Sequence, residues 1–230
     1  MTSYPVYITN LDEQRAFVVG SGPAAERKVE GLLDADARVT LIAPDPPATL
    51  REWAHDGRID WVERSYEPGD LEGAALVIVT ASGAVVDEVW AEAQERNVLV
   101  NTTGDDEHST FANGACIRRG PLVVSISTSG AAPTVSVRLR EQMADRFGPE
   151  YEAFLEMMDA LREPMQAQVD DFETRRDRWY QLVDSDLLDL LRNERYAEAQ
   201  TRVQSIVGAD VAAALDGWAE ERDEAVPADS

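Results

Sequence analysis

The sequence is short of several residues that define whole classes of protein. Its one cysteine, Cys116, leaves no material for an internal disulfide framework or for a metal site built from several thiolates. We expect Cys116 to be a buried structural thiol. Its one lysine, Lys28, stands against 44 acidic residues, and the formal net charge is -23. Such acidity disfavours nucleic acid and anionic membranes as partners. Because the acids are scattered rather than in blocks, we expect a solvated, halophilic-type acidic surface and not a docking surface for a basic partner.

Long apolar runs are also missing. No stretch approaches the roughly 18 to 20 uninterrupted residues that a membrane-spanning helix needs, and residues 1–5 lack the basic and apolar pattern of a signal peptide. We therefore expect a cytoplasmic protein with no membrane partner. The 230 residues, 44% of them hydrophobic, suit one α/β domain with a smaller appendage.

Buried strand patterns alternate with helical patterns in the first half of the chain. The expected strands are residues 15–19, 38–43, 59–63, 75–79 and 98–100, and the expected helices are 24–34, 48–56 and 85–96. Parallel neighbours need crossover connections, so this alternation implies a parallel sheet with helices on both faces. The sequence predicts a Rossmann-type α/β domain over residues 1–113.

The pattern changes after residue 113. Residues 118–121 predict a turn, 122–127 a strand, and 133–147 a helix that begins with proline. The chain is then predicted to be helical to about residue 221, with interruptions at Pro164 and Gly208. We expect a small α+β segment over 114–148, a helical C-terminal domain over 149–222 and a disordered tail over 223–230. Core packing is the expected role of apolar residues at helical spacing: Trp179, Tyr180, Leu182, Leu187, Leu188 and Leu191.

A glycine fingerprint stands between the first strand and the first helix. Gly20-Ser21-Gly22-Pro23-Ala24-Ala25 matches Gly-x-Gly-x-x-Ala, in which the first glycine permits a tight turn and the second lets the backbone approach a pyrophosphate. The third small residue allows close packing of helix on strand. This context, rather than the motif alone, predicts NAD binding at residues 20–24.

Further cofactor contacts are expected after the neighbouring strands. Pro44-Asp45 follows the second strand, where an acid normally binds the ribose hydroxyls, although Asp45 could instead be a turn residue between prolines. The lack of an adjacent arginine favours NAD over NADP. Ala81 and Ser82 follow the strand at 75–79 and are expected to close over the cofactor.

Several ordered motifs over residues 5–140 together resemble the siroheme synthase and precorrin-2 dehydrogenase family. They are Pro5-Val6-Tyr7-Ile8, Val18 to Lys28, Ala37 to Pro44, Phe111, Arg118-Arg119-Gly120 and Ile126 to Pro133. The resemblance implies NAD-dependent oxidation of precorrin-2 to sirohydrochlorin, joined in some members to insertion of ferrous iron. It also implies a homodimer formed through the segment 114–148, and a helical segment that completes the tetrapyrrole site. The methyltransferase domain fused in some relatives is expected to be absent.

The resemblance breaks at the position of the family's proposed acid/base. The family has an aspartate three residues after an asparagine that follows the fifth strand, and an ungapped match places Gly104 there. Asp105 and Asp106 could reach the same space and are the predicted catalytic residues. His108 is near them, but a surface or capping role is an alternative, and one histidine makes no metal site. No metal site is predicted. The segment after the fourth strand also departs from the family, with Asp87 in place of an asparagine.

Precorrin-2 carries many carboxylates, so an acidic protein must reverse its charge locally to bind it. The predicted anion site combines the N–H groups that open the helix at residue 133 with four arginines, which could equally pair with surface acids. Thr128 lies at a strand-to-helix switch, where either a ligand or dimer packing is expected. The predicted substrate-binding residues are Arg118, Arg119, Thr128, Arg138 and Arg140.

The leading hypothesis is a precorrin-2 dehydrogenase, with the tetrapyrrole, and ferrous iron if chelation is added, as its ligands. One alternative keeps only the chelatase function, against which the intact glycine turn argues. The other is a non-catalytic NAD-binding sensor, which the loss of the family aspartate at Gly104 keeps open.

Overall fold

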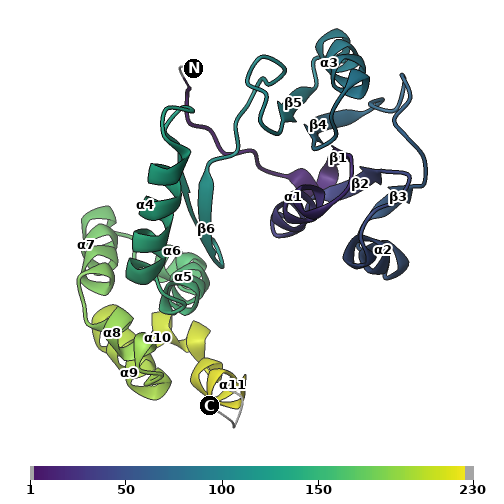
Figure 1. Ribbon diagram of the computed structural model, residues 1–230. Coiled ribbons are helices and arrows are strands. Elements are labelled where there is room, and N and C mark those ends of the chain that lie inside the picture. Colours follow the sequence, from purple (N-terminus) through teal and green to yellow (C-terminus); the bar gives the residue numbers. More distant parts are fainter. Residues whose placement is uncertain (1–2, 226–230) are drawn as a thin grey trace. The chain divides into compact units, whose positions relative to one another are not determined.

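The computed structural model describes residues 3–225. The chain divides between Asn113 and Gly114 into two compact units, which are described separately here (Figure 1). Of the expected tail at 223–230, residues 223–225 end the last helix, and residues 226–230 lie outside the described part of the chain. No helix within residues 3–225 combines the length and the apolar character needed to cross a membrane.

The first unit is built on a parallel five-stranded sheet of order β3-β2-β1-β4-β5, which confirms the predicted Rossmann-type architecture. The strands are β1 (Arg15–Val19), β2 (Arg38–Ile42), β3 (Asp60–Val62), β4 (Ala74–Val79) and β5 (Leu99–Thr102). A 3-10 turn, η1 (Leu11–Glu13), leads into β1, and the helices are α1 (Pro23–Leu33), α2 (Ala48–His55) and α3 (Ala84–Arg96). The last strand runs two residues beyond its expected end at Val100.

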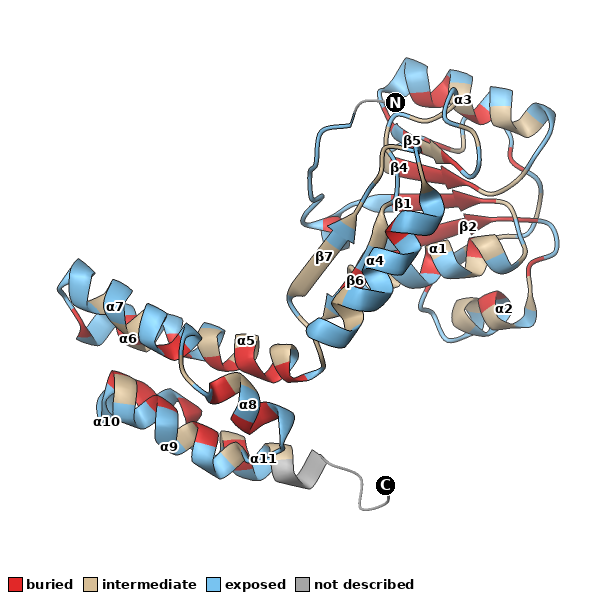
Figure 2. Cartoon of the chain, turned by 60° about the vertical axis from the view of Figure 1, so that its left-hand side comes forward, coloured by how far each residue is buried: buried red, intermediate tan, exposed pale blue. Residues whose placement is uncertain are grey.

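Helices cover both faces of this sheet, because successive strand residues point to opposite sides. Ala16 and Val18 of β1 pack in one core cluster with Val29 of α1 and with α2, whereas Phe17 of β1 packs in a second cluster with Val89 of α3. Figure 2 shows β1, β2 and β4 as almost continuously buried. Burial on both faces explains why these three strands are largely apolar.

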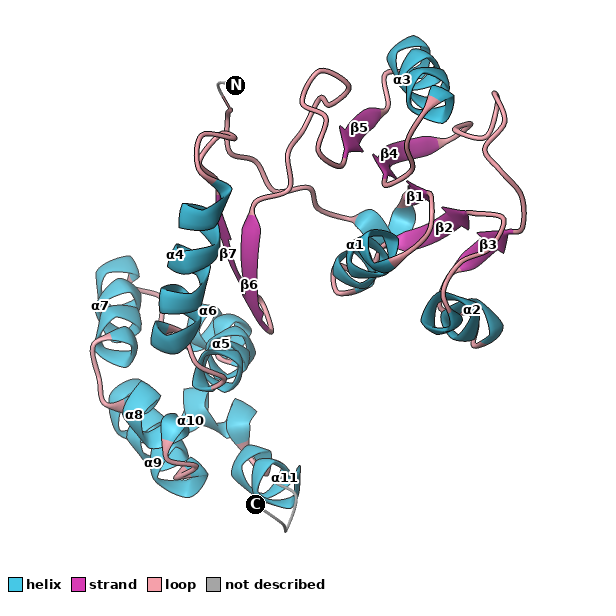
Figure 3. Cartoon of the chain, in the orientation of Figure 1, coloured by secondary structure: helices cyan, strands magenta, loops and turns pink. Residues whose placement is uncertain are grey.

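The second unit begins with an antiparallel hairpin of β6 (Ala115–Arg119) and β7 (Leu122–Ile126), followed by α4 (Pro133–Arg146), as Figure 3 shows. The turn is Gly120-Pro121, with Gly120 at φ +51°. The turn expected at residues 118–121 is therefore confined to its last two residues, because Arg118 and Arg119 belong to β6 and pair with β7. The expectation for Cys116 is wrong. Its side chain is exposed, since Ile117 occupies the buried position of this alternating strand.

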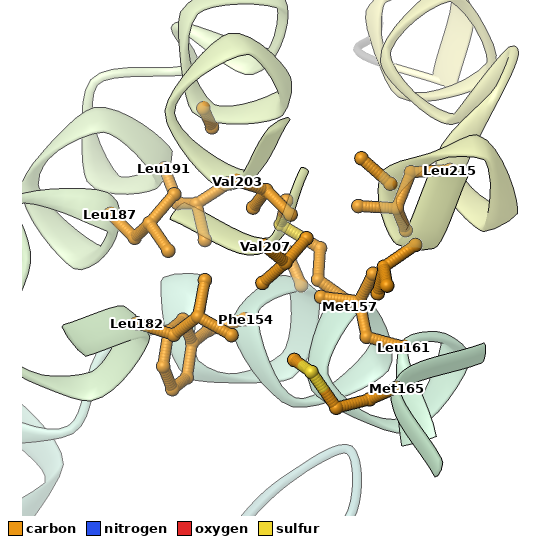
Figure 4. Packing of buried hydrophobic residues seen from close by; sticks show 14 of the residues in the cluster. Phe154, Met157, Leu161, Met165, Leu182, Leu187, Leu191, Val203, Val207 and Leu215 are labelled. Carbon is orange, nitrogen blue, oxygen red and sulfur yellow. The ribbon is translucent and has the colours of Figure 1, made fainter. Parts of the chain in front are cut away.

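The rest of the second unit is helical around its own core, which includes Met157, Met165 and Leu215 (Figure 4). The helices are α5 (Glu150–Ala160), α6 (Arg162–Gln168), α7 (Phe172–Val183), α8 (Leu187–Arg192), α9 (Tyr196–Val207), α10 (Ala209–Ala212), the 3-10 turn η2 (Ala213–Leu215) and α11 (Trp218–Ala225). Pro164 lies in the first turn of α6, where its missing N–H is not needed. The preceding helix, α5, ends at Ala160, before this proline. Gly208 separates α9 from α10 at φ +87°.

Core packing accounts for most of the apolar residues singled out in the tail. Leu182, Leu187 and Leu191 are buried, and Trp179 and Leu188 pack against the same core. Tyr180 is the exception, with 62% of its surface exposed. A core role for Tyr180 is wrong, because the face of α7 that carries it points to solvent.

Candidate functional site

The glycine turn after β1 is tied to the end of β4. Gly20 has φ +121°, and a Cβ there would lie 2.6 Å from both the Ala81 amide nitrogen and Thr80 Oγ1. The Thr80 N–H donates to the Val19 carbonyl at 2.9 Å. Glycine is therefore required at position 20 because the backbone after β4 closes directly onto the turn.

The second glycine has a different environment. Gly22 is the N-cap of α1 at φ +88°, a Cβ there would meet nothing within 4 Å, and no side chain caps the helix. Ser21 and Pro23 are exposed, and Ala24 is half-buried. Buried Ala25 lets α1 pack closely on the sheet. An open glycine before an uncapped helix N-terminus fits a pyrophosphate, which would accept hydrogen bonds from the free N–H groups at the positive end of the helix dipole.

The loop after β4 offers a second opening at the same sheet edge. Ala81 is half-buried and Ser82 is exposed, and they lead to Gly83, the N-cap of α3 at φ +86° with no side-chain cap. In the sheet, β1 lies between β2 and β4, so the strand order reverses its direction between β1 and β4. The carboxyl ends of these two strands therefore form the topological switch point of the sheet. Dinucleotides bind at such points, outside the carboxyl ends of the strands.

The loop after β2 carries an ion pair that the sequence did not predict. Pro44 and Asp45 are exposed, and the Asp45 carboxylate contacts the guanidinium of Arg51 on α2. Arg51 also donates from Nε to the Pro46 carbonyl at 3.0 Å. The premise that no arginine adjoins Asp45 is therefore wrong, because one helical turn brings Arg51 back to the acid.

The loop after β5 begins with a turn that explains Gly104. The Asp105 N–H donates to the Thr102 carbonyl at 3.2 Å, and Gly104 has φ +79°, the value that a type II turn requires at its third position. A Cβ at Gly104 would meet nothing within 4 Å, so the backbone angle and not space selects glycine. The turn places the first carboxylate of this loop at Asp105.

The Asp105 carboxylate is engaged in the loop. It accepts hydrogen bonds from the backbone N–H groups of Glu107 (3.0 Å) and His108 (3.2 Å), and one oxygen lies 2.7 Å from His108 Nδ1. The hydrogen bond from the His108 ring is the main cause that holds the pKa of Asp105 below its ordinary value. Asp106 is exposed.

His108 joins this loop to α3. Its Nε2 lies 3.4 Å from the Asp87 carboxylate in the first turn of α3, and the rings of His108 and Trp90 form a T-shaped contact with centroids 5.6 Å apart. Sequence reasoning named Asp87 as a departure from the family but did not connect it with His108, 21 positions further along the chain. The only available signal was that β4 and β5 are neighbours, which brings their following loops together.

The predicted substrate-binding arginines belong to the second unit and differ in whether they already form hydrogen bonds or ion pairs. Arg119 donates from Nε to the Phe147 carbonyl at 3.0 Å, and Arg138 pairs with Glu141 at 2.9 Å. Arg118 and Arg140 are exposed, and neither pairs with an acidic side chain in the part of the chain that the structure describes. The alternative of pairing with a surface acid therefore applies to Arg138.

Thr128 stabilises the backbone at the start of α4. Its Oγ1 accepts a hydrogen bond from the Ala132 N–H at 3.2 Å and lies 3.3 Å from Ser136 Oγ. It therefore holds the strand-to-helix step in place. Within residues 3–222, whose side chains the structure describes, no three His, Cys, Asp or Glu side chains are grouped so as to hold a metal ion.

The sheet order and the open glycine turn define a Rossmann-type dinucleotide-binding protein. Residues 7–115 match the family described as "Putative NAD(P)-binding", and residues 150–206 match the "Sirohaem synthase dimerisation region". The latter covers α5 to α9, downstream of the segment 114–148 to which the resemblance assigned dimerisation. The chain thus combines an NAD(P)-binding region with a dimerisation region.

Known proteins with this arrangement include siroheme synthases. The chain is 29% identical to the siroheme synthase of Chromobacterium violaceum over 219 residues, 94% of this chain and 46% of the relative. It is 32% identical to siroheme synthase 3 of Aeromonas hydrophila over 189 residues, 82% of this chain and 40% of the relative. It also shares its fold with the solved structure of SirC, precorrin-2 dehydrogenase, at a TM-score of 0.72 and 21% identity, covering 89% of this chain and 98% of that one.

These findings show that the chain belongs to the siroheme synthase N-terminal family, with its NAD-binding and dimerisation regions. It spans less than half the length of the siroheme synthases that it matches.

Proposed function

We propose that this protein catalyses the NAD-dependent oxidation of precorrin-2 to sirohydrochlorin. The observation that carries the proposal is the meeting of three loops at one sheet edge: the open glycine turn after β1, the opening at Gly83 after β4, and the carboxylate loop after β5. The first two fit a dinucleotide and the third supplies proton-accepting groups. The family to which the chain belongs supports the tetrapyrrole as the substrate.

The reaction removes two hydrogens from the substrate. When bound, NAD⁺ takes up one of them as a hydride at its nicotinamide ring, and the other leaves as a proton to a base. We propose that the turn at residues 20–24 holds the pyrophosphate, that Pro44 and Asp45 border the ribose, and that Ala81 and Ser82 line the cofactor beyond them. The base belongs to the loop after β5, which contains Asp105 and Asp106.

The substrate carboxylates require cations. Arg118 and Arg140 are the better candidates of the predicted set, because their exposed guanidiniums are not neutralised by acidic side chains of the described residues. Arg119 and Arg138 would have to exchange their present partners, and Thr128 contributes by fixing the start of α4.

We further propose a cytoplasmic homodimer. Exposed Val135, Val137 and Leu139 on α4 support a contribution of residues 114–148 to the dimer interface, beside the dimerisation region at 150–206. The net charge of -23 supports a surface adapted to high salt and argues against nucleic acid as a partner. Light scattering tests the homodimer, and activity measured at increasing salt concentration tests the adaptation to high salt.

The proposed reaction is tested with the purified protein, precorrin-2 and NAD under anaerobic conditions in high salt. We expect NADH to form in a 1:1 ratio with sirohydrochlorin. Binding of NAD without turnover would overturn the proposal in favour of a sensor. Insertion of ferrous iron into supplied sirohydrochlorin, with no NADH formed from precorrin-2, would instead identify a chelatase.

A further inference from the structure

A histidine held between two carboxylates stands out in the first unit. His108 Nδ1 lies 2.7 Å from Asp105 Oδ2 within its own loop, and His108 Nε2 lies 3.4 Å from Asp87 Oδ1 on α3. The edge contact with Trp90 of α3 restricts the ring further. The imidazole is therefore oriented by groups from two elements, yet 28% of its side-chain surface remains exposed. A side chain that is both fixed and accessible suits proton transfer.

The two ring nitrogens have different surroundings. Nδ1 is at full hydrogen-bond distance from a carboxylate, which can only accept, so Nδ1 carries the hydrogen and Nε2 of the neutral ring has a free lone pair. At 3.4 Å, Asp87 is near enough to stabilise a positive ring but makes no short hydrogen bond with Nε2. Nε2 is thus the basic atom of the cluster.

Asp105 is less suited to accept the proton itself. Its carboxylate already accepts three hydrogen bonds from Glu107 and His108, chiefly the one from the His108 ring, and these hold its pKa below the ordinary value for aspartate. A carboxylate stabilised in its charged form is a weaker base. A carboxylate that fixes one nitrogen of an imidazole, while the other nitrogen takes up the proton, is a recurrent arrangement in catalysis.

We propose that His108 Nε2 is the proton acceptor of the dehydrogenation, and that Asp105 and Asp87 are positioning residues that orient the ring and stabilise its positive charge. This assignment rests on the function proposed above. In each turnover the hydride passes from substrate to NAD⁺ and the proton passes from substrate to Nε2. His108 then releases the proton to solvent through its exposed side.

The assignment is tested by replacing each of the two histidines of the chain. We expect His108→Ala to lower kcat about 100-fold or more, as for loss of a general base, with the Kd for NAD and the unfolding temperature little changed. Added imidazole should restore part of the rate to His108→Ala. The matched control is His55→Ala at the end of α2, which should keep wild-type kcat and give no response to imidazole.

A second pair of variants separates positioning from catalysis. Asp105→Asn and Asp87→Asn should lower kcat by less than His108→Ala does and move the half-maximal rate to lower pH. The reason is that each substitution removes a charge that favours the imidazolium. A purely structural role would lower the rate without moving the pH profile.

Three outcomes would overturn the assignment. A near-normal kcat in His108→Ala, with an active wild type, would exclude His108 as the proton acceptor but leave the proposed dehydrogenase activity standing. A larger loss in Asp105→Ala than in His108→Ala, with no response to imidazole, makes Asp105 the base. A wild-type protein that forms no NADH from precorrin-2 removes the proposed function and this assignment together.

Discussion

The guanidinium of Arg51 contacts the carboxylate of Asp45 at the carboxyl end of β2. Both side chains are at least half exposed, so the pair adds little to stability, on the order of 0 to 1 kcal/mol. Its importance lies in cofactor choice. An acid at this position accepts hydrogen bonds from ribose hydroxyls, whereas a nearby arginine accommodates the 2′-phosphate of NADP.

Asp45→Ala should therefore narrow the preference for NAD. We expect NAD binding to weaken about tenfold, or about 1.4 kcal/mol, while NADP binding is kept or improves because Arg51 is released. Calorimetric titration with both cofactors measures the ratio of the two dissociation constants. Glu52→Ala, an exposed acid beside Arg51 in sequence, is the matched control. An unchanged ratio in Asp45→Ala would show that this loop does not contact the ribose.

The glycines of the turn should respond differently to substitution. Gly20→Ala should lower the free energy of unfolding by about 3 kcal/mol or more, because the new Cβ meets the backbone at Ala81. Gly22→Ala adds no contact and should cost only the backbone strain, about 1 to 3 kcal/mol, but should weaken NAD binding.

Gly31→Ala supplies the control for both variants, since it lies on the exposed side of α1 with free space around it. It should stabilise the protein by up to about 1 kcal/mol. Chemical denaturation ranks the three variants. Equal losses for Gly20→Ala and Gly22→Ala would contradict the close approach of β4 to the glycine turn.

Buried Glu92 of α3 should make stability depend on pH. Burial raises the pKa of Glu92, but hydrogen bonds from Tyr66, the Gly69 and Leu71 N–H groups and Arg96 outweigh it, so the pKa lies below the ordinary value. The stabilisation is therefore fully present above the unfolded-state value of about 4.3 and is lost as the pH falls through the lower folded-state pKa.

Glu92→Gln should reduce the free energy of unfolding at neutral pH by about 1 to 3 kcal/mol, because it removes charge-assisted hydrogen bonds. The difference from wild type should shrink as the pH falls below about 4. Urea denaturation from pH 3 to pH 7 measures it, with exposed Glu95→Gln on the same helix as the control. A difference that stays constant over this range would contradict the charged state of Glu92.

Leu182 and Tyr180 on α7 test the helical core. Leu182 is fully buried, and Leu182→Ala should destabilise the second unit by about 2 to 5 kcal/mol. Tyr180→Ala should change stability by less than about 0.5 kcal/mol, because its ring is largely exposed. Thermal unfolding followed by circular dichroism compares the two variants. A large loss from Tyr180→Ala would mean that its exposed ring is covered by a partner.

The first unit could be predicted in outline because its signals are local. Apolar runs long enough for strands, a glycine turn, and a proline at the start of α1 each act over a few residues. The strand at Ala115–Arg119 was missed because Arg118 and Arg119 carry no strand signal of their own. Their pairing comes from β7 across the hairpin. Cys116 is likewise exposed because it lies on the opposite strand face from the buried Ile117.

From the sequence, candidate site residues could be named only where they follow directly from a motif. Asp45 is paired with Arg51, and His108 lies beside Asp87. Both partners lie on helices that pack back against the loops, and the sequence pattern does not show this packing. Gly104 illustrates the same limit. The sequence showed that the expected carboxyl group was missing, but only the turn at Thr102–Asp105 shows how the next residue is oriented.

Each compact unit surrounds a core of its own, with no residue shared between the helical cluster and the two clusters of the sheet. A dinucleotide bound at the glycine turn is thermodynamically linked to the native state of the unit that holds it. In a calorimetric scan, saturation with NAD should then shift the melting of the sheet core more than that of the helical core. The melting temperature of the sheet core thus offers a readout of NAD occupancy that requires neither turnover nor the tetrapyrrole substrate.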